Sequence, residues 1–208
     1  MLGEMSVRRL STSDLDSAVE VLSLAFAEDP FVIWNFEHRV AALSPVAFRI
    51  TAGLLTEAGT AFGYFEGDSI VGVALYQAPG ETFKLGSMLR SGAEIVYRSL
   101  GRTTLRMTHA FGETERFKQD CMGDTPYFYL DTVAVHPRHA RRGFGSALIT
   151  DSLKQVRGQR REPCFLISQP HNLDYYLKRG FKSVRDRLLP KCNVRFHGLL
   201  EKSAAGEG

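Results

Sequence analysis

Apolar and polar residues follow two different periods along this chain, and the changes of period mark its predicted elements. After a short strand-like start at residues 7–10, one face of a helix is apolar. Ser13 is its predicted N-cap, with Asp16 three residues later, and Pro30 ends this helix or starts the next one. The apolar positions at helical spacing are Leu15, Val19, Leu22 and Phe26.

Residues 45–120 are predicted to form a helix, then a β-hairpin, then further helices. Pro45 is predicted to open a helix that runs to Glu57, because proline is well tolerated in a first turn. Two β-rich runs at 61–65 and 70–76 flank a turn signal, which predicts an antiparallel pair. Residues 81–120 predict two or three inserted helices that either roof a pocket or pack over a sheet. Their apolar positions are Leu85, Met88, Leu89, Ile95, Val96, Leu105, Met107 and Phe111.

The string "PYFYLDTVAV", residues 126–135, is almost continuously apolar and rich in aromatic and β-branched residues, as a central strand is. A helix from Gly143 to Arg157, a buried strand "CFLIS" and a short helix closed by Gly180 follow it. Two strands, "FKSVRDRLL" and "VRFHGLL", complete the series. This order predicts a single mixed α/β sheet, with residues 201–208 as a disordered tail.

Composition narrows the class of protein. The 208 residues are 44% hydrophobic and 24% charged, which fits one globular domain. Three cysteines without a CxxC pair indicate neither a disulfide framework nor a zinc site, so a cytoplasmic location is expected. The N-terminus lacks the apolar core of a signal peptide. A run of about 18 apolar residues is absent from the sequence, and we expect no membrane-spanning helix.

Positive charge is concentrated in one region, although the net charge is only +3. A small anionic ligand is the first interpretation of this concentration, and a nucleic acid is the alternative. Single-strand binders place aromatic residues among their basic ones, and this region does not. The clustered residues are Arg138, Arg141, Arg142, Arg157, Arg160 and Arg161.

The loop between the central strand and the following helix has the properties of an anion site. Backbone N–H groups converge at a helix N-terminus, where the helix dipole is positive. Gly143 and Gly145 allow close approach to the backbone, and Arg141 and Arg142 add forked donors, so a pyrophosphate would fit. Neither GxxxxGK[ST] nor GxGxxG occurs here.

Two strings carry a resemblance to a known family. "VAVHPRHARRGFGSALI" resembles motif A of the GNAT superfamily of N-acetyltransferases, and "FLISQPHNLDYYLKRGF" resembles its motif B. The N-terminal "LAFAEDPF" and the hairpin extend the resemblance, which is strongest to the group related to puromycin N-acetyltransferase. It implies an N-acetyltransferase domain at residues 1–200. In its mostly antiparallel sheet, flanked by helices, a helical insert precedes the central strand.

The resemblance also implies acetyl-CoA as cosubstrate. The backbone of Val133 and Val135 would pair with the pantetheine arm, and the amides of residues 141–146 would hold the pyrophosphate. Ala140 stands where the family has Gln or Arg, and Arg141 where glycine is common, so we expect weaker or altered affinity. The positions implied to contact acetyl-CoA are Val133, Ala134, Val135, Arg141, Arg142, Gly143, Phe144, Gly145, Ser146 and Asn172.

Two residues are predicted to act in catalysis. Tyr176 matches the family tyrosine that protonates the leaving thiolate, although a core aromatic is the alternative. Asp131 lies two residues before Val133, and period-two alternation places both on one face, so Asp131 is the predicted base, directly or through water. A structural buried carboxylate is its alternative. Asn172 is either a cofactor contact or an ordinary N-cap.

Other polar residues are weaker candidates. Glu28 and Asp29 would bind a cationic substrate or simply end a helix before Pro30. His136 and His139 have HxxH spacing without an evident third ligand, so a metal site is not expected. Cys164 lies inside an apolar strand and is predicted to be a buried hydrophobe.

The predicted function is transfer of an acetyl group from acetyl-CoA to the primary amine of a small molecule, directly, in a ternary complex. The alternatives are a non-catalytic acetyl-CoA-binding module and an acetyltransferase of proteins or peptides, with a nucleic-acid-binding domain third. The predicted partners are acetyl-CoA and a small amine, without nucleic acid or membrane. A homodimer is an open alternative.

Overall fold

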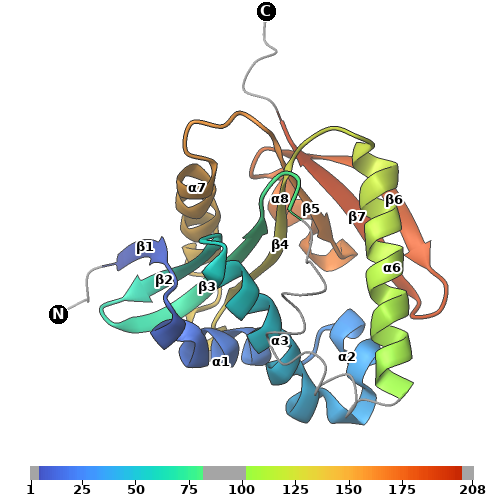
Figure 1. Cartoon of the computed structure of the whole chain (residues 1–208), viewed down its shortest axis with the longest axis horizontal. Helices are drawn as coiled ribbons and strands as arrows, with labels where there is room; N and C mark the ends of the chain where they lie inside the picture. Colours follow the sequence, from blue (N-terminus) through green and yellow to red (C-terminus); the bar gives the residue numbers. More distant parts are fainter. Residues whose placement is uncertain (1–4, 82–101, 203–208) are drawn as a thin grey trace, which may run out of the picture.

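The computed structural model describes residues 5–81 and 102–202, and Figure 1 shows how their elements are arranged. Short 3-10 turns at Thr12–Asp14, Glu37–Arg39, Pro137–His139 and Pro170–Asn172 lead into four of the helices. The strands are β1 Met5–Arg9, β2 Ala61–Glu66, β3 Ser69–Gln77, β4 Phe128–Val135, β5 Cys164–Ser168, β6 Phe181–Leu189 and β7 Val194–Glu201. The helices are α1 Leu15–Ala25, α2 Pro30–Phe36, α3 Val40–Glu57, α6 Arg102–Met122, α7 Phe144–Arg157 and α8 Leu173–Leu177.

The strands form one seven-stranded sheet in the order β1-β2-β3-β4-β5-β7-β6. All neighbours are antiparallel except β4 and β5, which are parallel and are connected through α7. The predicted mixed, mostly antiparallel sheet with flanking helices is therefore confirmed. The predicted hairpin is also present, as β2 and β3 joined across Gly67 and Asp68.

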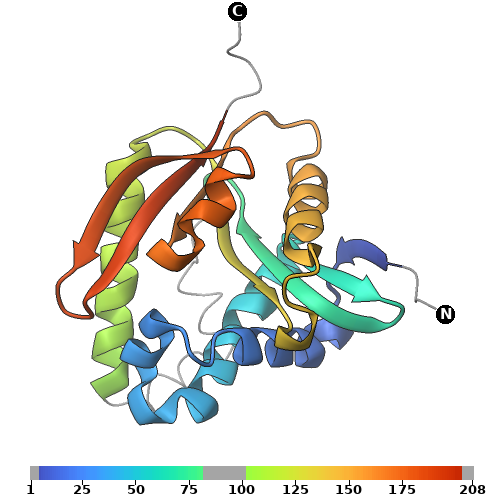
Figure 2. The same ribbon diagram turned by 180° about the vertical axis from the view of Figure 1, so that it is seen from behind.

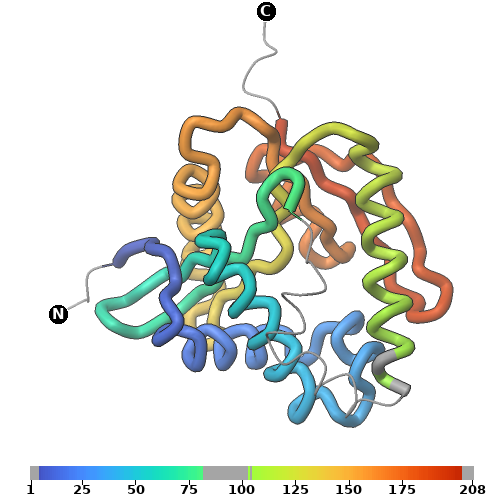
Figure 3. Tube along the Cα trace, viewed as in Figure 1, coloured from blue at the N-terminus to red at the C-terminus, as the bar shows by residue number. Residues whose placement is uncertain are grey.

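Helices cover both faces of the sheet. On one face, Leu148 and Leu153 of α7 and Tyr176 of α8 pack with the inward residues of β2 to β5. On the other face, α1 and α3 cover β2 to β4, while Phe117 of α6 packs against the β6–β7 hairpin. Figure 1 shows α6 beside that hairpin, Figure 2 shows α7 and α8 from behind, and the trace in Figure 3 follows the same course.

The central strand β4 carries an extra residue and separates from β5. Leu75 pairs with Thr132 and Tyr76 with Leu130, so Asp131 is the additional residue of a β-bulge. On its other side, β4 pairs with β5 only along residues 128–130. Residues 132–135 thus stay paired with β3, while their second edge has no strand neighbour among the described residues.

Several helix boundaries differ from the prediction. The N-cap is Ser11, whose N–H donates to Asp14 Oδ2 at 2.8 Å, because a 3-10 turn precedes α1 and shifts the capping box two residues earlier. Helix α3 begins at Val40 and contains Pro45 inside it. The backbone bond that this proline lacks is offset by packing of the neighbouring Leu43 and Ala47 against Phe36.

The helical insert is described only in part. Its described portion is one long helix, α6, on which Leu105, Met107 and Phe111 lie. The number of helices over residues 81–120 stays a prediction, because residues 82–101 lie outside the described part of the chain. Leu105 is largely exposed, so it does not serve the packing that its spacing predicted. The other predicted apolar positions, between 85 and 96, lie outside the described residues.

Within residues 5–81 and 102–202, the stretch Pro30–Glu57 is long and apolar enough to cross a membrane, by length and composition. The structure interrupts it. Helix α2 ends at Phe36, Glu37 has a φ of 51°, and α3 begins after a 3-10 turn. Leu55 of α3 is buried with α1 against the sheet. That the protein acts without a membrane stays a prediction.

Candidate active site

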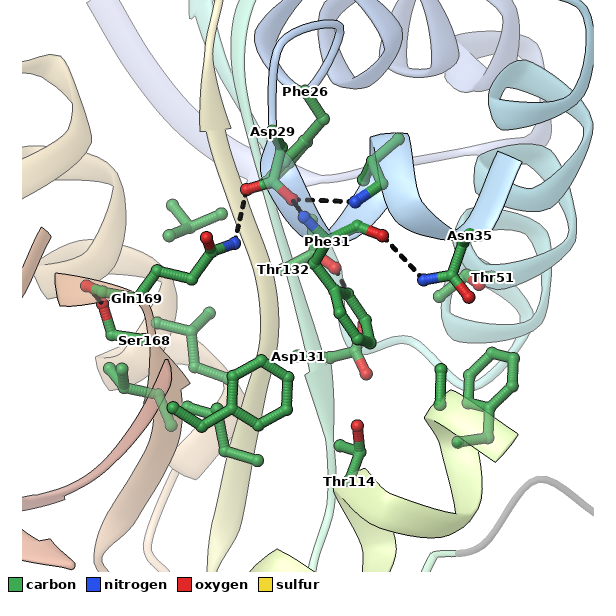
Figure 4. A pocket seen from close by; sticks show the side chains of 18 of the residues that line it. Phe26, Asp29, Phe31, Asn35, Thr51, Thr114, Asp131, Thr132, Ser168 and Gln169 are labelled. Carbon is green, nitrogen blue, oxygen red and sulfur yellow. Dashed lines mark hydrogen bonds between the residues drawn. The ribbon is translucent and has the colours of Figure 1, made fainter. Parts of the chain in front are cut away.

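A cavity of about 300 Å³ opens where β4 separates from β5. Helices α2, α3 and α6 form its outer wall, and β4, β5 and the start of α8 form its inner wall. Figure 4 shows Asp29, Asp131 and Gln169 among the polar groups that line it. Eight of the other lining residues are aromatic. The aromatic lining residues are Phe26, Phe31, Phe36, Phe48, Phe111, Tyr129, Tyr176 and Phe196.

Asp131 is held in this wall by two donors. Gln77 Nε2 donates to Asp131 Oδ1 at 2.9 Å, and Thr132 Oγ1 donates to Oδ2 at 2.8 Å. The buried Lys118 reaches Gln77 Oε1 at 3.3 Å and Glu115 Oε1 at 2.6 Å. Burial raises the pKa of Asp131, although the bond from Thr132 and the charge of Lys118 oppose the rise. The Asp131 carboxylate is thus held in one orientation, and its raised pKa makes it a stronger base.

Strict alternation along β4, from which we placed Asp131 and Val133 on one face, is wrong because the bulge interrupts it. Val133 pairs with Ala74 and packs on the α7 side of the sheet, as Leu130 does. Asp131 instead bonds Gln77, on the opposite face from Tyr76. Both Asp131 and Val133 nevertheless line the cavity, because the gap between β4 and β5 opens to both faces.

Tyr176 lies on α8 and lines the same cavity. Its ring is 8% exposed and makes edge contacts with Tyr175 and Phe181. Burial is the main cause that raises the pKa of Tyr176 far above its ordinary value, so the phenol keeps its proton at neutral pH. Tyr176 is therefore both a core aromatic residue and part of the cavity wall.

The loop before α7 presents unused backbone donors. Arg141 has a φ of 64° and Gly143 a φ of 83°, and these two left-handed residues turn the chain into the helix. None of the hydrogen bonds among the described residues uses the amides of residues 141–145. The amide of Ser146 differs, because it donates to the Gly143 carbonyl at 3.0 Å. Five of the six predicted amides are therefore free to bind an anion.

A side chain from motif B joins this loop to α8. Arg179 Nε donates to Ser146 Oγ, and its Nη1 donates to the carbonyl of Tyr175, over whose ring the guanidinium stacks. Gly145 lies close to this helix, since a Cβ at this position would be 2.8 Å from the Tyr175 hydroxyl, which would have to shift. The predicted cofactor loop and the tyrosine helix thus form one connected unit.

For Asn172 and Asp29, the structure distinguishes between the two roles that the sequence left open. Asn172 precedes α8, but its side chain makes no capping bond, and it lines the cavity. Asp29 starts α2 rather than ending α1, because its Oδ1 accepts from the amides of Phe31 and Val32 at 2.9 and 3.0 Å. Gln169 Nε2 donates to Asp29 Oδ2 at 2.7 Å and joins the end of β5 to α2.

The remaining candidates are used within the fold. His136 Nδ1 accepts from the Arg138 amide at 3.1 Å, and no group of three metal-ligating side chains occurs among the described residues. Cys164 is fully buried, and burial raises the pKa of its thiol, which makes it a poor nucleophile. Within the arginine cluster, Arg157 pairs with Glu201 and Arg160 with Glu162.

Residues 23–181 match the family model described as the acetyltransferase (GNAT) family, and this match spans most of the chain. The chain belongs to the GNAT family. Solved structures share the fold of this GNAT protein at low sequence identity. One is a histone acetyltransferase and related acetyltransferase from Corynebacterium glutamicum, at 18% identity and a TM-score of 0.66, with all of both chains covered.

Two further structures are similar to this GNAT protein. Arylalkylamine N-acetyltransferase 2 from Aedes aegypti has 13% identity and a TM-score of 0.70, with 96% of this chain and 99% of that chain covered. A GNAT family acetyltransferase from Brucella melitensis, in complex with acetyl-CoA, has 18% identity and a TM-score of 0.51. This match covers 94% of this chain and 86% of the Brucella chain.

Sequence reasoning missed the partners that surround the predicted residues of this GNAT protein. Gln77 of β3 bonds Asp131, and Lys118 of α6 bonds both Gln77 and Glu115. The places of these residues along the chain give no local sign of these contacts. Arg179 could have been found, since one helical turn separates it from Tyr175 within motif B.

We predict that replacing Arg141 by glycine stabilises this GNAT protein. Arg141 has left-handed backbone, which costs a residue with a Cβ about 1–2 kcal/mol. Glycine is also more flexible in the unfolded chain, which lowers the free energy of unfolding by about 0.4–1 kcal/mol. The expected net rise in the free energy of unfolding is about 0.5 kcal/mol, measured by urea denaturation.

Arg142→Gly is the matched control, because it removes the same charge one residue later, where φ is not positive. It should lower the free energy of unfolding by about 0.5–1 kcal/mol. Equal effects of the two substitutions would show that charge, and not backbone conformation, sets the response.

We also predict that Asp131 makes stability fall with pH. Its folded-state pKa is raised above the ordinary 3.8. Between these two values the unfolded chain has lost a proton that the folded protein retains, so the free energy of unfolding decreases as pH rises. The difference between wild type and Asp131→Asn should fall through this window and then stay constant, in urea titrations at fixed ionic strength. A difference that rises with pH would mean that the two donors and the charge of Lys118 outweigh burial.

Proposed function

We propose that this GNAT protein transfers the acetyl group of acetyl-CoA to the primary amine of a small molecule, directly, in a ternary complex. The observation that carries this proposal is the cavity at the parting of β4 and β5, into which Asp131 and Tyr176 both open. A base and a proton donor therefore share one space with the free edge of the central strand.

The binding roles follow from unused backbone groups. The edge of β4 at residues 133–135 would pair with an extended pantetheine arm as a further strand would. The amides of residues 141–145 and the start of α7 suit a pyrophosphate, with the guanidinium of Arg142 beside them. Asn172 would contact the same ligand from the cavity wall. Bound acetyl-CoA supplies the activated acetyl group.

The chemical roles divide between two side chains. Asp131, with its raised pKa, takes the proton of the amine, directly or through a water molecule. Tyr176, which remains a neutral phenol, gives a proton to the departing sulfur. Main-chain N–H groups near Val133 stabilise negative charge on the carbonyl oxygen. Alignment of the amine and the thioester in this cavity supplies much of the rate.

The comparisons support this proposal in two ways. The related Brucella protein binds acetyl-CoA, and the related Aedes protein is named for arylalkylamines. The cavity of about 300 Å³ with an aromatic lining suits a small amine with an apolar body better than a protein segment. Membership of the puromycin acetyltransferase-like group, a cytoplasmic location and a homodimer stay predictions.

The direct test is release of free CoA from acetyl-CoA in the presence of a panel of primary amines, followed with a thiol reagent. Amine-dependent release supports the proposed reaction. Binding of acetyl-CoA without release for any amine or peptide would favour a non-catalytic module. Release only with peptides would favour an acetyltransferase of proteins.

We predict that Tyr176→Phe lowers kcat by about 10- to 100-fold, because the departing sulfur loses its proton donor. The Kd for acetyl-CoA should change by no more than about threefold, since the ring and its packing are kept. Steady-state kinetics and calorimetric titration measure the two quantities.

Tyr175→Phe is the matched control, as Tyr175 is the adjacent tyrosine and does not line the cavity. Its kcat should equal that of wild type. If both substitutions lower kcat alike, or if Tyr176→Phe leaves it unchanged, Tyr176 is not the proton donor.

A further inference from the structure

A buried amide oxygen on α2 has no protein partner. Asn35 is 7% exposed and lines the same cavity as Asp131. Its Oδ1 accepts no hydrogen bond from any residue in the described part of the chain. An acceptor so deeply buried is normally satisfied, because leaving it unpaired removes the hydrogen bonds it makes with water in the unfolded chain.

The orientation of this amide is fixed by its other end. Asn35 Nδ2 donates to the carbonyl of Phe31 at 2.8 Å, one helical turn earlier. A carbonyl oxygen can only accept, so exchanging the two ends of the amide would place two acceptors against each other. Oδ1 is therefore the atom left for the cavity, and Figure 4 shows it beyond the dashed bond to Phe31.

The surroundings of Asn35 make this atom distinctive. The neighbouring lining residues on α2 are Phe31, Val32 and Phe36, which offer no side-chain donor. The carboxylates of Asp131 and Asp29 in the wall already accept hydrogen bonds, from Gln77 and Gln169. Asn35 Oδ1 is thus a buried acceptor without a partner, beside apolar side chains of α2.

We infer that Asn35 Oδ1 binds a hydrogen-bond donor on the substrate, at a distance from the amine that is acetylated. The inference rests on the proposed function and names its substrate class. That class is an amine whose apolar body carries a hydroxyl or N–H group. Asn35 lies on α2, whereas the reacting groups lie on β4 and α8, so one molecule can meet both walls. Asn35 is then a specificity-determining residue.

Two matched pairs of amines test this inference. Tyramine and 2-phenylethylamine differ by one phenolic hydroxyl, and 6-amino-1-hexanol and heptylamine differ by a hydroxyl in place of a methyl group. We would measure the Kd of each amine for the CoA-bound protein by calorimetry and its kcat/KM with acetyl-CoA. In at least one pair, the hydroxylated member should bind about tenfold more tightly, as one additional buried hydrogen bond gives.

Asn35→Leu removes the acceptor and keeps the number and branching of the side-chain heavy atoms. It should reduce the preference to within about twofold, mainly by weakening the hydroxylated member. Asn35→Ala is the second variant, should leucine prevent folding, because the ratio within each pair remains the measured quantity. Thr51→Val is the matched control, as it removes a hydroxyl that α3 contributes to the same cavity and leaves Asn35 in place. It should keep the preference.

The outcomes separate the inference from the proposed function. Preferential binding that Asn35→Leu abolishes supports the inference, even if acetylation is not observed and the proposed function fails. Acetylation of both members of each pair at equal kcat/KM overturns the inference and leaves the function standing. A preference that survives Asn35→Leu, or that Thr51→Val abolishes instead, also overturns it. If the wild type binds none of the four amines, the inference is overturned, and the proposed function is decided separately by CoA release with the wider amine panel.

Discussion

The extra residue that Asp131 adds to β4 is the constraint on which the rest of the site depends. Beyond Leu130 the strand continues to pair with β3 and leaves β5, so the sheet opens in its middle. That opening exposes the second edge of β4, connects the two faces of the sheet and creates the cavity. It also directs the end of β4 toward the loop whose amides start α7. Strand edge, cavity and loop therefore have one geometric origin.

A sheet that opens at its centre exposes polar groups, and the neighbouring strands and helices supply their partners. Gln77 and Thr132 bond the carboxylate of Asp131, and Lys118 bonds Gln77 from α6. Gln169 and Asp29 close the other side of the cavity. These bonds offset the burial of a carboxylate without pairing it directly with a cation, which is why its pKa remains raised. A group in that state can serve as a base, and a tightly paired one could not.

The sequence allowed the elements to be predicted wherever local pattern decides them. The apolar run of β4 and the glycines of the loop before α7 are examples. The order of the predicted strands and helices then gave the fold class. The bulge could not be predicted, because one inserted residue leaves the string "YLDTVAV" equally apolar on both sides. Partners such as Gln77, Lys118 and Asn35 depend on contacts far apart in the chain. Ser11 replaced Ser13 as the cap because both serines satisfy the same pattern.

The central claim is that the opened strand and its loop bind acetyl-CoA, and the thermal unfolding midpoint with and without acetyl-CoA tests it most directly. At about 100 times its Kd, a ligand adds about 2.7 kcal/mol to the free energy of unfolding. For a chain of this size the account predicts a rise in Tm of about 5–10 °C. An unchanged Tm at millimolar acetyl-CoA would contradict it, since the free amides and the free edge of β4 would then have no affinity for this ligand.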